Sequence, residues 1–380
     1  MLAPAELQTA RRIRVRGQVQ GVGFRPFVYR LAVELGLQGW VRNDADGVEI
    51  EVQGNAAGIE SMLARLHREA PVLARVDKVE TSAAAVAERG PEFTIRESRS
   101  GQIHTGITPD AAICPDCLHE LFDPADRRYR HPFINCIHCG PRFTLTARMP
   151  YDRGNTSMAQ FTQCPACQDE YDNPTTRRFH AQPNACPQCG PHLNLFDSQW
   201  QPVATDDETA ASAALLRAGQ VVAVKGIGGF HLVCDARNAA TVARLRGGKR
   251  REEKPFAVMA LNPASAQYYA ELSSEETVLL ESSERPIVLA HKSAGCDEVL
   301  AGIAPGLASI GLMLPYTPLH YLLFHELLGR PSGTDWLQQA APVALVMTSA
   351  NPGGEPLVKD DADARESLGR LADAFLTHDR

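Results

Sequence analysis

Eight cysteines, arranged twice at one spacing, constrain the middle of this chain more than any other feature. Each set holds two Cys-x2-Cys pairs with eighteen residues between the pairs, and the second set lies fifty positions after the first. A Cys-x2-Cys pair presents two thiolates to one tetrahedral ion, and a second pair completes a closed four-sulfur site. The sequence therefore predicts two structural zinc sites, with the pairing of ligands between the two sets left open. The ligands would be Cys114, Cys117, Cys136, Cys139, Cys164, Cys167, Cys186 and Cys189.

The repeat extends beyond the sulfur atoms. Both units begin with Cys-Pro, pass through an Arg-Arg-aromatic step and close with Gly-Pro. The two steps are Arg127, Arg128, Tyr129 and Arg177, Arg178, Phe179. This agreement between the units indicates a duplicated zinc knuckle over residues 110–195.

Two other interpretations of the cysteines are weaker. A disulfide scaffold needs an oxidising compartment, but residues 1–15 show no secretory signal pattern and no run of eighteen apolar residues occurs. We therefore expect a cytoplasmic protein without a membrane span. Histidine ligands are the second alternative, but four sulfurs already saturate each ion, so nearby histidines are expected at the surface or behind the ligands. These are His131, His138, His180 and His192.

The length and charge of the chain limit its organisation and its partners. A chain of 380 residues accommodates two or three domains, and the cysteine block leaves one segment on each side. The formal net charge is −7. An acidic total disfavours a general nucleic-acid binder, so any anion site must be built locally.

Residues 12–97 have the pattern of a small α+β domain. Residues 13–19 and 47–54 alternate apolar and polar side chains as strands do, and residues 25–36 have helical periodicity that ends at Gly36. A second helix is expected over 56–70, with further strands near 75–81 and 92–98. The order is close to β-α-β-β-α-β, the ferredoxin-like arrangement.

A glycine-containing loop lies between the first strand and the first helix of this domain. It is formed by Gln20, Gly21, Val22, Gly23 and Phe24, followed by Arg25. Glycines let backbone N–H groups turn toward an anion, and the helix N-terminus adds positive potential. The arginine can fork onto a phosphate. A short Gly-x-Gly would otherwise indicate only a tight turn.

The wider sequence favours function for this loop. GQVQGVGFRPFVYRLA followed by VRNDADGVEIEVQG resembles the acylphosphatase family along residues 12–97. The resemblance implies that Arg25 and the loop amides hold a phosphate, and that Asn43, expected in the VRNDADG turn, orients the attacking water. A mixed anhydride is already activated, so positioning and charge stabilisation suffice for its hydrolysis.

Residues 205–380 alternate strand and helix patterns, which indicates a twisted α/β domain. Helices are expected over 208–220, over 238–250 with Asn238 as N-cap, and from Pro318 onward. Strands flank a glycine turn within 221–236, and buried strands are expected over 254–261, 285–292 and 343–351. No Gly-x4-Gly-Lys-Ser/Thr loop occurs, which disfavours a P-loop site. Cys234 is expected to be a buried apolar residue.

A cluster of cations lies at the end of one predicted helix in this acidic chain. Lys249, Arg251 and Lys254, together with Ser349 and Asn351, resemble the pattern of the YrdC-like domain. That resemblance implies binding of ATP with Mg and of a carboxylate-type substrate, and it adds Lys225 and His231 as weaker candidates. Several cationic side chains are needed to bind a triphosphate. A solvated helix end is the plainer interpretation.

Together the three segments resemble the N-terminal part of the HypF family, which matures NiFe hydrogenases. KGIGGFHLVCDARN, RRYRHPFINCIHCGPRFT and RRFHAQPNACPQCGPH carry that resemblance. It implies that carbamoyl phosphate is hydrolysed to carbamate, which ATP then converts to carbamoyl adenylate. In the family the YrdC-like domain continues beyond the point that corresponds to Arg380, so we expect this domain, residues 205–380, to be incomplete at its C-terminal end. The resemblance also implies that transfer to the partner HypE needs a further transferase domain.

Two alternatives of other kinds remain open. A threonylcarbamoyl-adenylate synthase shares the YrdC-like domain but has no acylphosphatase domain or double zinc unit. The other alternative is a zinc-ribbon module that binds RNA or a protein partner, in which the flanking domains have only a structural role. That module predicts salt-sensitive RNA binding without phosphate release.

Overall fold

The computed structural model describes residues 8–87, 90, 92–99, 106–251, 253–351 and 356–380. Backbone contacts divide the chain into two compact units. The first unit comprises residues up to 110 together with 135–190, and the second comprises 111–134 together with 191–380. No helix in the described ranges is both long enough and apolar enough to cross a membrane.

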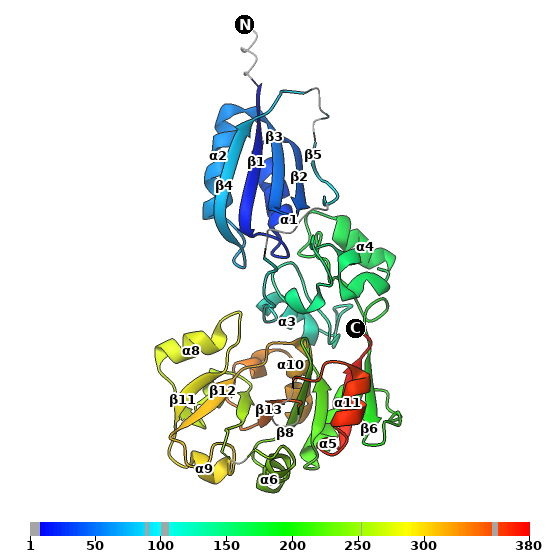
Figure 1. Cartoon of the computed structure of the whole chain (residues 1–380), viewed down its shortest axis with the longest axis vertical. Coiled ribbons are helices and arrows are strands. Elements are labelled where there is room, and N and C mark those ends of the chain that lie inside the picture. Colours follow the sequence, from blue (N-terminus) through cyan, green and yellow to red (C-terminus); the bar gives the residue numbers. More distant parts are fainter. Residues whose placement is uncertain (1–7, 88–89, 91, 100–105, 252, 352–355) are drawn as a thin grey trace. The chain divides into compact units, whose positions relative to one another are not determined.

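The first unit contains a five-stranded sheet in the order β4-β1-β3-β2-β5. Strand β1 pairs antiparallel with β3 and β4, β2 pairs antiparallel with β3, and β5 joins β2 in parallel. This is the predicted β-α-β-β-α-β arrangement, extended by β5 (Figure 1). The bounds are β1 Gln8–Gln18, α1 Phe24–Glu34, β2 Gln38–Asp44, β3 Gly47–Asn55, α2 Ala56–Arg68, β4 Arg75–Ala83 and β5 Phe93–Ile95.

Apolar side chains of the sheet and of both helices form the core of this unit. Ile13, Ile50, Val28 and Met62 belong to one buried cluster, each with essentially no exposed surface. The α2 helix is capped by Asn55, whose side chain accepts from the N–H of Gly58 at 2.6 Å. These contacts fix the helices against the sheet, and thereby fix the loop that joins β1 to α1.

Asn43 differs from its sequence-based assignment. We expected it in a turn, but it lies in β2 opposite Val48 of β3 and is only 1% exposed. The turn that follows is shorter than the polar VRNDADG segment suggested, because Arg42 and Asp44 are also strand residues. A strand gives Asn43 a more rigid backbone than a turn would.

The cysteine repeats each begin with a short helix. Helix α3 spans Pro115–Phe122 in the second unit and α4 spans Pro165–Asp172 in the first. Both start directly after the first cysteine of their repeat, with proline in the first helical turn. Between the repeats the chain makes 3-10 turns at Phe143–Leu145, Arg153–Asn155 and Ser157–Gln160.

The second unit is built on a nine-stranded mixed sheet in the order β10-β11-β12-β9-β13-β8-β7-β14-β6. The strands are β6 Leu193–Asp197, β7 Val222–Lys225, β8 Phe230–Asp235, β9 Ala257–Ala260, β10 Ala270–Glu271, β11 Val288–Lys292, β12 Ser309–Met313, β13 Ala344–Ser349 and β14 Ala374–His378. The helices are α5 Glu208–Arg217, α6 Ala239–Gly248, α7 Pro263–Ala266, α8 Ser274–Glu281, α9 Cys296–Val299, α10 Pro318–Leu327 and α11 Asp361–Ser367, with a 3-10 turn at Asp335–Leu337.

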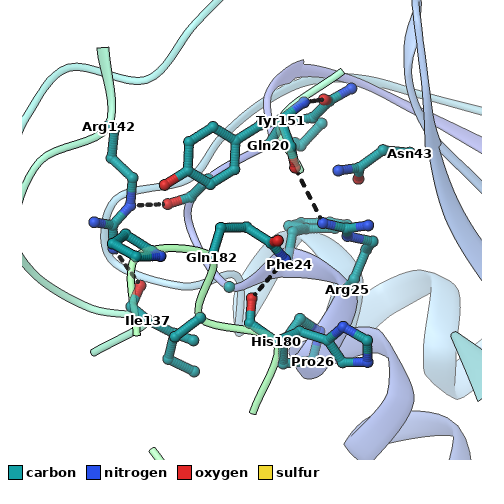
Figure 2. Close-up of a pocket in the computed structure, with 15 residues that line it drawn as sticks. Gln20, Phe24, Arg25, Pro26, Asn43, Ile137, Arg142, Tyr151, His180 and Gln182 are labelled. Atoms are coloured by element: carbon teal, nitrogen blue, oxygen red, sulfur yellow. Dashed lines mark hydrogen bonds between the residues drawn. The ribbon is translucent and has the colours of Figure 1, made fainter. Parts of the chain in front are cut away.

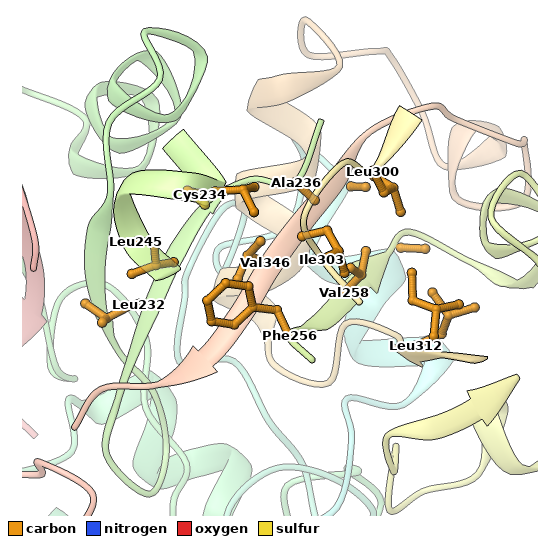
Figure 3. Close-up of a cluster of buried hydrophobic side chains, with 14 of the residues drawn as sticks. Leu232, Cys234, Ala236, Leu245, Phe256, Val258, Leu300, Ile303, Leu312 and Val346 are labelled. Carbon is orange, nitrogen blue, oxygen red and sulfur yellow. The ribbon is translucent and has the colours of Figure 1, made fainter. Parts of the chain in front are cut away.

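The core of this unit runs along the central strands. Figure 3 shows Leu232, Phe256, Val258 and Val346 within the same apolar cluster. Cys234 belongs to it too and has no exposed surface, as predicted; burial raises the pKa of its thiol to about 12. The predicted α/β class is therefore confirmed.

One predicted strand is less buried than expected. Strand β11 is present, but Leu289 is 68% exposed while Val288 and Ala290 are buried. Only the two-residue strand β10 lies between β11 and the sheet edge. Side chains of β11 are therefore buried on one face of the sheet only. On the other face they reach solvent, close to the edge of the sheet.

Candidate functional site

The eight cysteines form two clusters, each made from one repeat. The sulfurs of Cys114, Cys117, Cys136 and Cys139 all lie within 4.8 Å of one another, and so do those of Cys164, Cys167, Cys186 and Cys189. Measured separations are 3.6–3.8 Å. Ligands on a tetrahedral zinc ion, with Zn–S of about 2.3 Å, are about 3.8 Å apart. A disulfide would need about 2.05 Å.

Local hydrogen bonds explain why each repeat folds into the same knuckle. The N–H of Arg130 donates to the carbonyl of Leu121, and fifty positions later the N–H of His180 donates to that of Tyr171. Both Arg130 and His180 have left-handed backbones, with φ of 58° and 53°. The duplicated sequence thus folds as a duplicated chain path.

The thiols of the second cluster are suited to a metal. Although burial opposes ionisation of Cys164, hydrogen bonds with Cys167 and with other cluster thiols lower its pKa to about 7. A thiolate is the form that binds zinc. Four sulfurs leave no coordination position for a substrate, so both sites suit a structural ion.

A pocket in the first unit brings the predicted phosphate loop together with Arg25 and Asn43 (Figure 2). Arg25 is 8% exposed and Asn43 is 1% exposed. Gly21 and Gly23 both have φ of 76°, a left-handed conformation that glycine adopts without strain. Among the predicted loop residues, Gln20 and Phe24 also line this pocket, whereas the buried side chain of Val22 belongs to the apolar core.

Arg25 is held from several directions. Its Nη1 lies 2.9 Å from Oδ1 of Asp152 and donates to Oγ of Ser98 at 3.3 Å, and its Nη2 donates to the carbonyl of Tyr151 at 3.2 Å. With its oxygen facing the guanidinium, the Asn43 amide accepts from Nε and Nη2, each at 3.2 Å. The guanidinium is thus pre-oriented beside the loop.

One wall of this pocket was missed by our sequence reasoning. Arg142, Tyr151, His180 and Gln182 line it, although all four lie in the cysteine-rich segment (Figure 2). His180, which we expected at the surface or behind the ligands, is partly buried and lines this pocket. Burial, and then the charge of Arg25, lower its pKa to about 4, so it is neutral at pH 7. The sequence offered one indication of this wall: after Cys-Gly-Pro the first repeat has Arg142, whereas the second has His192.

A second group of polar residues lies in the second unit, at the end of β13. Lys249 is 4% exposed, and its ammonium donates to the carbonyls of Ser349 and Asn351, both at 2.7 Å. The Ser349 hydroxyl donates to Oδ1 of Asn351 at 2.7 Å. Three predicted residues therefore meet. Burial, and then the charges of Arg251 and Lys254, lower the pKa of Lys249 to about 8.

The remaining predicted residues lie around this group to different degrees. Arg251 donates to Oγ1 of Thr348 at 2.9 Å, and His231 is the cross-strand partner of Ser349. Lys254 is exposed. Lys225 forms an ion pair outside this group, with its Nζ 2.7 Å from Oδ1 of Asp361. The cationic helix end is thus partly buried, unlike a purely solvated one.

Comparison with protein families assigns each segment. The acylphosphatase model matches residues 11–95, the model described as HypF finger matches 113–146 and 163–196, and the Sua5/YciO/YrdC model, described as telomere recombination, matches 214–380. The carbamoyltransferase HypF2 of Cupriavidus necator is 60% identical over 380 residues, which cover 99% of this chain. The chain belongs to the HypF family.

Solved structures agree with this assignment. A crystal structure of full-length HypF in the phosphate- and nucleotide-bound form superposes with a TM-score of 0.92, at 42% identity over all of this chain. The chain spans 47% of the length of both HypF proteins. An acylphosphatase of Salinibacter ruber is 40% identical over 94 residues, which are 24% of this chain and 98% of that protein. The relatives are thus named as enzymes.

Proposed function

We propose that this HypF-family chain hydrolyses carbamoyl phosphate and then activates the resulting carbamate with ATP. The observation that carries the first step is the meeting of Arg25 and Asn43 with four loop residues in one pocket; these are Gln20, Gly21, Gly23 and Phe24. The names of the relatives support the substrate, since they are called carbamoyltransferases and acylphosphatases.

For hydrolysis, Arg25 and the loop amides would bind the phosphoryl oxygens and stabilise their charge. The amide of Asn43, beside that guanidinium, would orient the attacking water. Water attacks phosphorus and releases a proton, the bond from phosphorus to the bridging oxygen breaks, and carbamate leaves with that oxygen while the water oxygen stays in phosphate. Pre-oriented donors suit this reaction because they need no reorganisation as charge develops.

For activation, Lys249, Arg251 and Lys254 would bind the triphosphate of ATP with Mg, while Ser349 and Asn351 contact phosphate or sugar. A carbamate oxygen attacks the α-phosphorus, pyrophosphate leaves and carbamoyl adenylate forms. His231, opposite Ser349, is a candidate for the carbamoyl side. Lys225 is the weakest candidate because Asp361 already neutralises it. A HypF protein solved with phosphate and nucleotide supports both ligands.

The further steps are proposals on the family resemblance. The carbamoyl group would pass to a HypE-like protein through a domain outside this sequence, toward the cyanide ligand of a NiFe hydrogenase. Two structural zinc ions would hold the cysteine-rich segment. A cytoplasmic location would suit it, because the thiols stay reduced there.

The deciding experiment incubates the chain with carbamoyl phosphate and ATP while phosphate, AMP and pyrophosphate are followed together. We expect phosphate release, and carbamoyl-phosphate-dependent exchange of pyrophosphate into ATP. The Arg25→Ala variant should release phosphate at least ~100-fold more slowly, in keeping with the loss of a principal charge-stabilising group. Unchanged release by that variant would refute the assignment of Arg25.

The same assay separates the alternatives. A threonylcarbamoyl-adenylate synthase would require threonine and bicarbonate for pyrophosphate exchange. A zinc-ribbon module would give no phosphate release, and would instead bind RNA in a salt-sensitive manner.

A further inference from the structure

The phosphate loop is held in place by two residues that lie outside the acylphosphatase match. Thr108 Oγ1 donates to the carbonyl of Gln20 at 2.7 Å, and Arg142 Nε donates to the carbonyl of Gly21. The family match ends at residue 95. The orientation of two successive loop peptides therefore depends on parts of the chain that follow the domain.

These two contacts decide where the loop amides point. A trans peptide is planar, with its C=O and the following N–H on opposite sides. When Thr108 and Arg142 hold the carbonyls outward, the N–H groups of Gly21 and Val22 face the other way. No described residue accepts a hydrogen bond from either N–H. These donors stay available for an anion.

Arg142 is itself fixed by the first zinc knuckle. Its Nη1 donates to the carbonyls of Cys139 and Pro141 at 2.8 and 2.9 Å, and its Nη2 to those of Cys136 and Ile137 at 3.1 and 3.0 Å. The side chain is among the largest that are fully buried. Of the five carbonyls that accept from Arg142, that of Gly21 included, two thus belong to cysteines of the first cluster.

The second knuckle has no such arginine. Its residue after Cys-Gly-Pro is His192, which is exposed, with its side chain beside Asp379. The fold of a knuckle therefore does not require an arginine at this position. Together with the contact to Gly21, this indicates a role that is specific to the first knuckle.

We infer that Thr108 and Arg142 are positioning residues for the phosphate loop, and that metal in the Cys136–Cys139 cluster tunes the affinity of the loop for phosphate. This inference rests on the proposed acyl phosphate hydrolysis. Without the carbonyl contacts the two peptides can rotate, and their N–H groups lose alignment with the anion. Each lost charge-assisted hydrogen bond weakens phosphate binding about tenfold.

The test uses two matched threonine variants. Thr108→Val and Thr176→Val each remove one hydroxyl that donates to a backbone carbonyl, that of Gln20 in one case and that of Glu170, at 2.6 Å, in the other. The dissociation constant of inorganic phosphate is measured by calorimetry for the zinc-loaded chain. We expect about tenfold weaker binding for Thr108→Val and a change below twofold for Thr176→Val. Equal constants would overturn the inference.

Two further variants examine the link to the metal. Arg142→Lys keeps the positive charge but loses the forked set of guanidinium N–H donors. This variant should therefore bind phosphate more weakly than the parent and more tightly than Arg142→Met. Cys139→Ser should lose one zinc, measured by mass spectrometry, and bind phosphate about tenfold more weakly. Loss of that zinc with unchanged phosphate affinity in a chain that stays folded would overturn the metal part.

Kinetics distinguish this inference from the proposed function. If the parent binds phosphate but hydrolyses no carbamoyl phosphate, the proposed function fails while the binding comparison still decides the inference. If hydrolysis occurs, Thr108→Val should raise KM with a smaller change in kcat, whereas general destabilisation would lower the active fraction and leave KM unchanged. A parent that binds no phosphate would refute both.

Discussion

At the residue scale, Lys249 shows how a lysine side chain can be buried within a group of polar residues. Its ammonium lies on backbone carbonyls of Ser349 and Asn351 rather than in water. The charges of Arg251 and Lys254 add to the effect of burial, and together they lower the pKa of Lys249 to about 8. A lysine in this state is positively charged at pH 7 but loses its proton close to physiological conditions.

Binding of ATP should therefore weaken as pH rises. A group with pKa about 8 is about 90% charged at pH 7 and about 10% charged at pH 9, and only the charged form attracts a triphosphate. We expect the dissociation constant for Mg-ATP to rise about tenfold between these pH values. Calorimetry at pH 7, 8 and 9 measures it.

Lys249→Met is the control for this pH dependence. It should bind more weakly than the parent at pH 7 and give a flatter profile, since it has no ammonium to lose. A parent whose affinity is equal at pH 7 and 9 would contradict the role of Lys249.

At the element scale, helix α6 ends directly before the predicted cations, with Lys249 as its C-cap. Asn238 accepts from the N–H of Thr241 at 3.1 Å, and the helix ends where Lys249 begins to turn toward β13. The chain before β9 then brings Arg251 to Thr348. A local signal, the N-cap, thus sets the start of a helix whose other end leads into the predicted nucleotide-binding residues.

Removing this cap should loosen the helix. Asn238→Ala leaves an N–H of the first turn without its acceptor, at a cost of about 1 kcal/mol. We expect amide hydrogen exchange over 239–248 to become about fivefold faster, measured by mass spectrometry. Asn238→Asp keeps the acceptor and should match the parent, and an Ala variant with parental exchange would contradict the assignment.

At the scale of the whole molecule, the cysteine-rich segment combines buried apolar side chains with two groups of four thiols. One described apolar cluster there has Leu145, Met158 and Ala185 as its buried members. Such a segment gains its stability from ligation, because metal binding and folding are coupled when the site exists only in the folded chain.

We therefore expect two zinc ions per chain and a local unfolding when they are removed. Mass spectrometry should find one ion in Cys189→Ser, since each cluster takes its ligands from one repeat. After chelation, trypsin should cut first at exposed arginines within 110–195, such as Arg148. Retained protease resistance of that segment after verified metal loss would contradict this expectation.

The sequence by itself determined what depends on local pattern. Cysteine spacing predicted the two clusters, and periodicity predicted most helices and strands. The glycines before Arg25 predicted a tight turn, and only the resemblance to acylphosphatases assigned that loop to phosphate. Asn43 was found through resemblance, but its place in a strand was not, because short polar runs fit turns and strand ends alike.

Only the tertiary structure decided which distant segments share a site. Arg142 lies 121 positions from Gly21, and His180 joins the same pocket from a later repeat. Apart from the difference between the two repeats at position 142, nothing local to either residue indicates such a contact, since it arises from chain paths fixed by the sheet and the cysteine clusters together. The burial of Lys249 was hidden for the same reason: its two acceptors follow it by 100 and 102 positions.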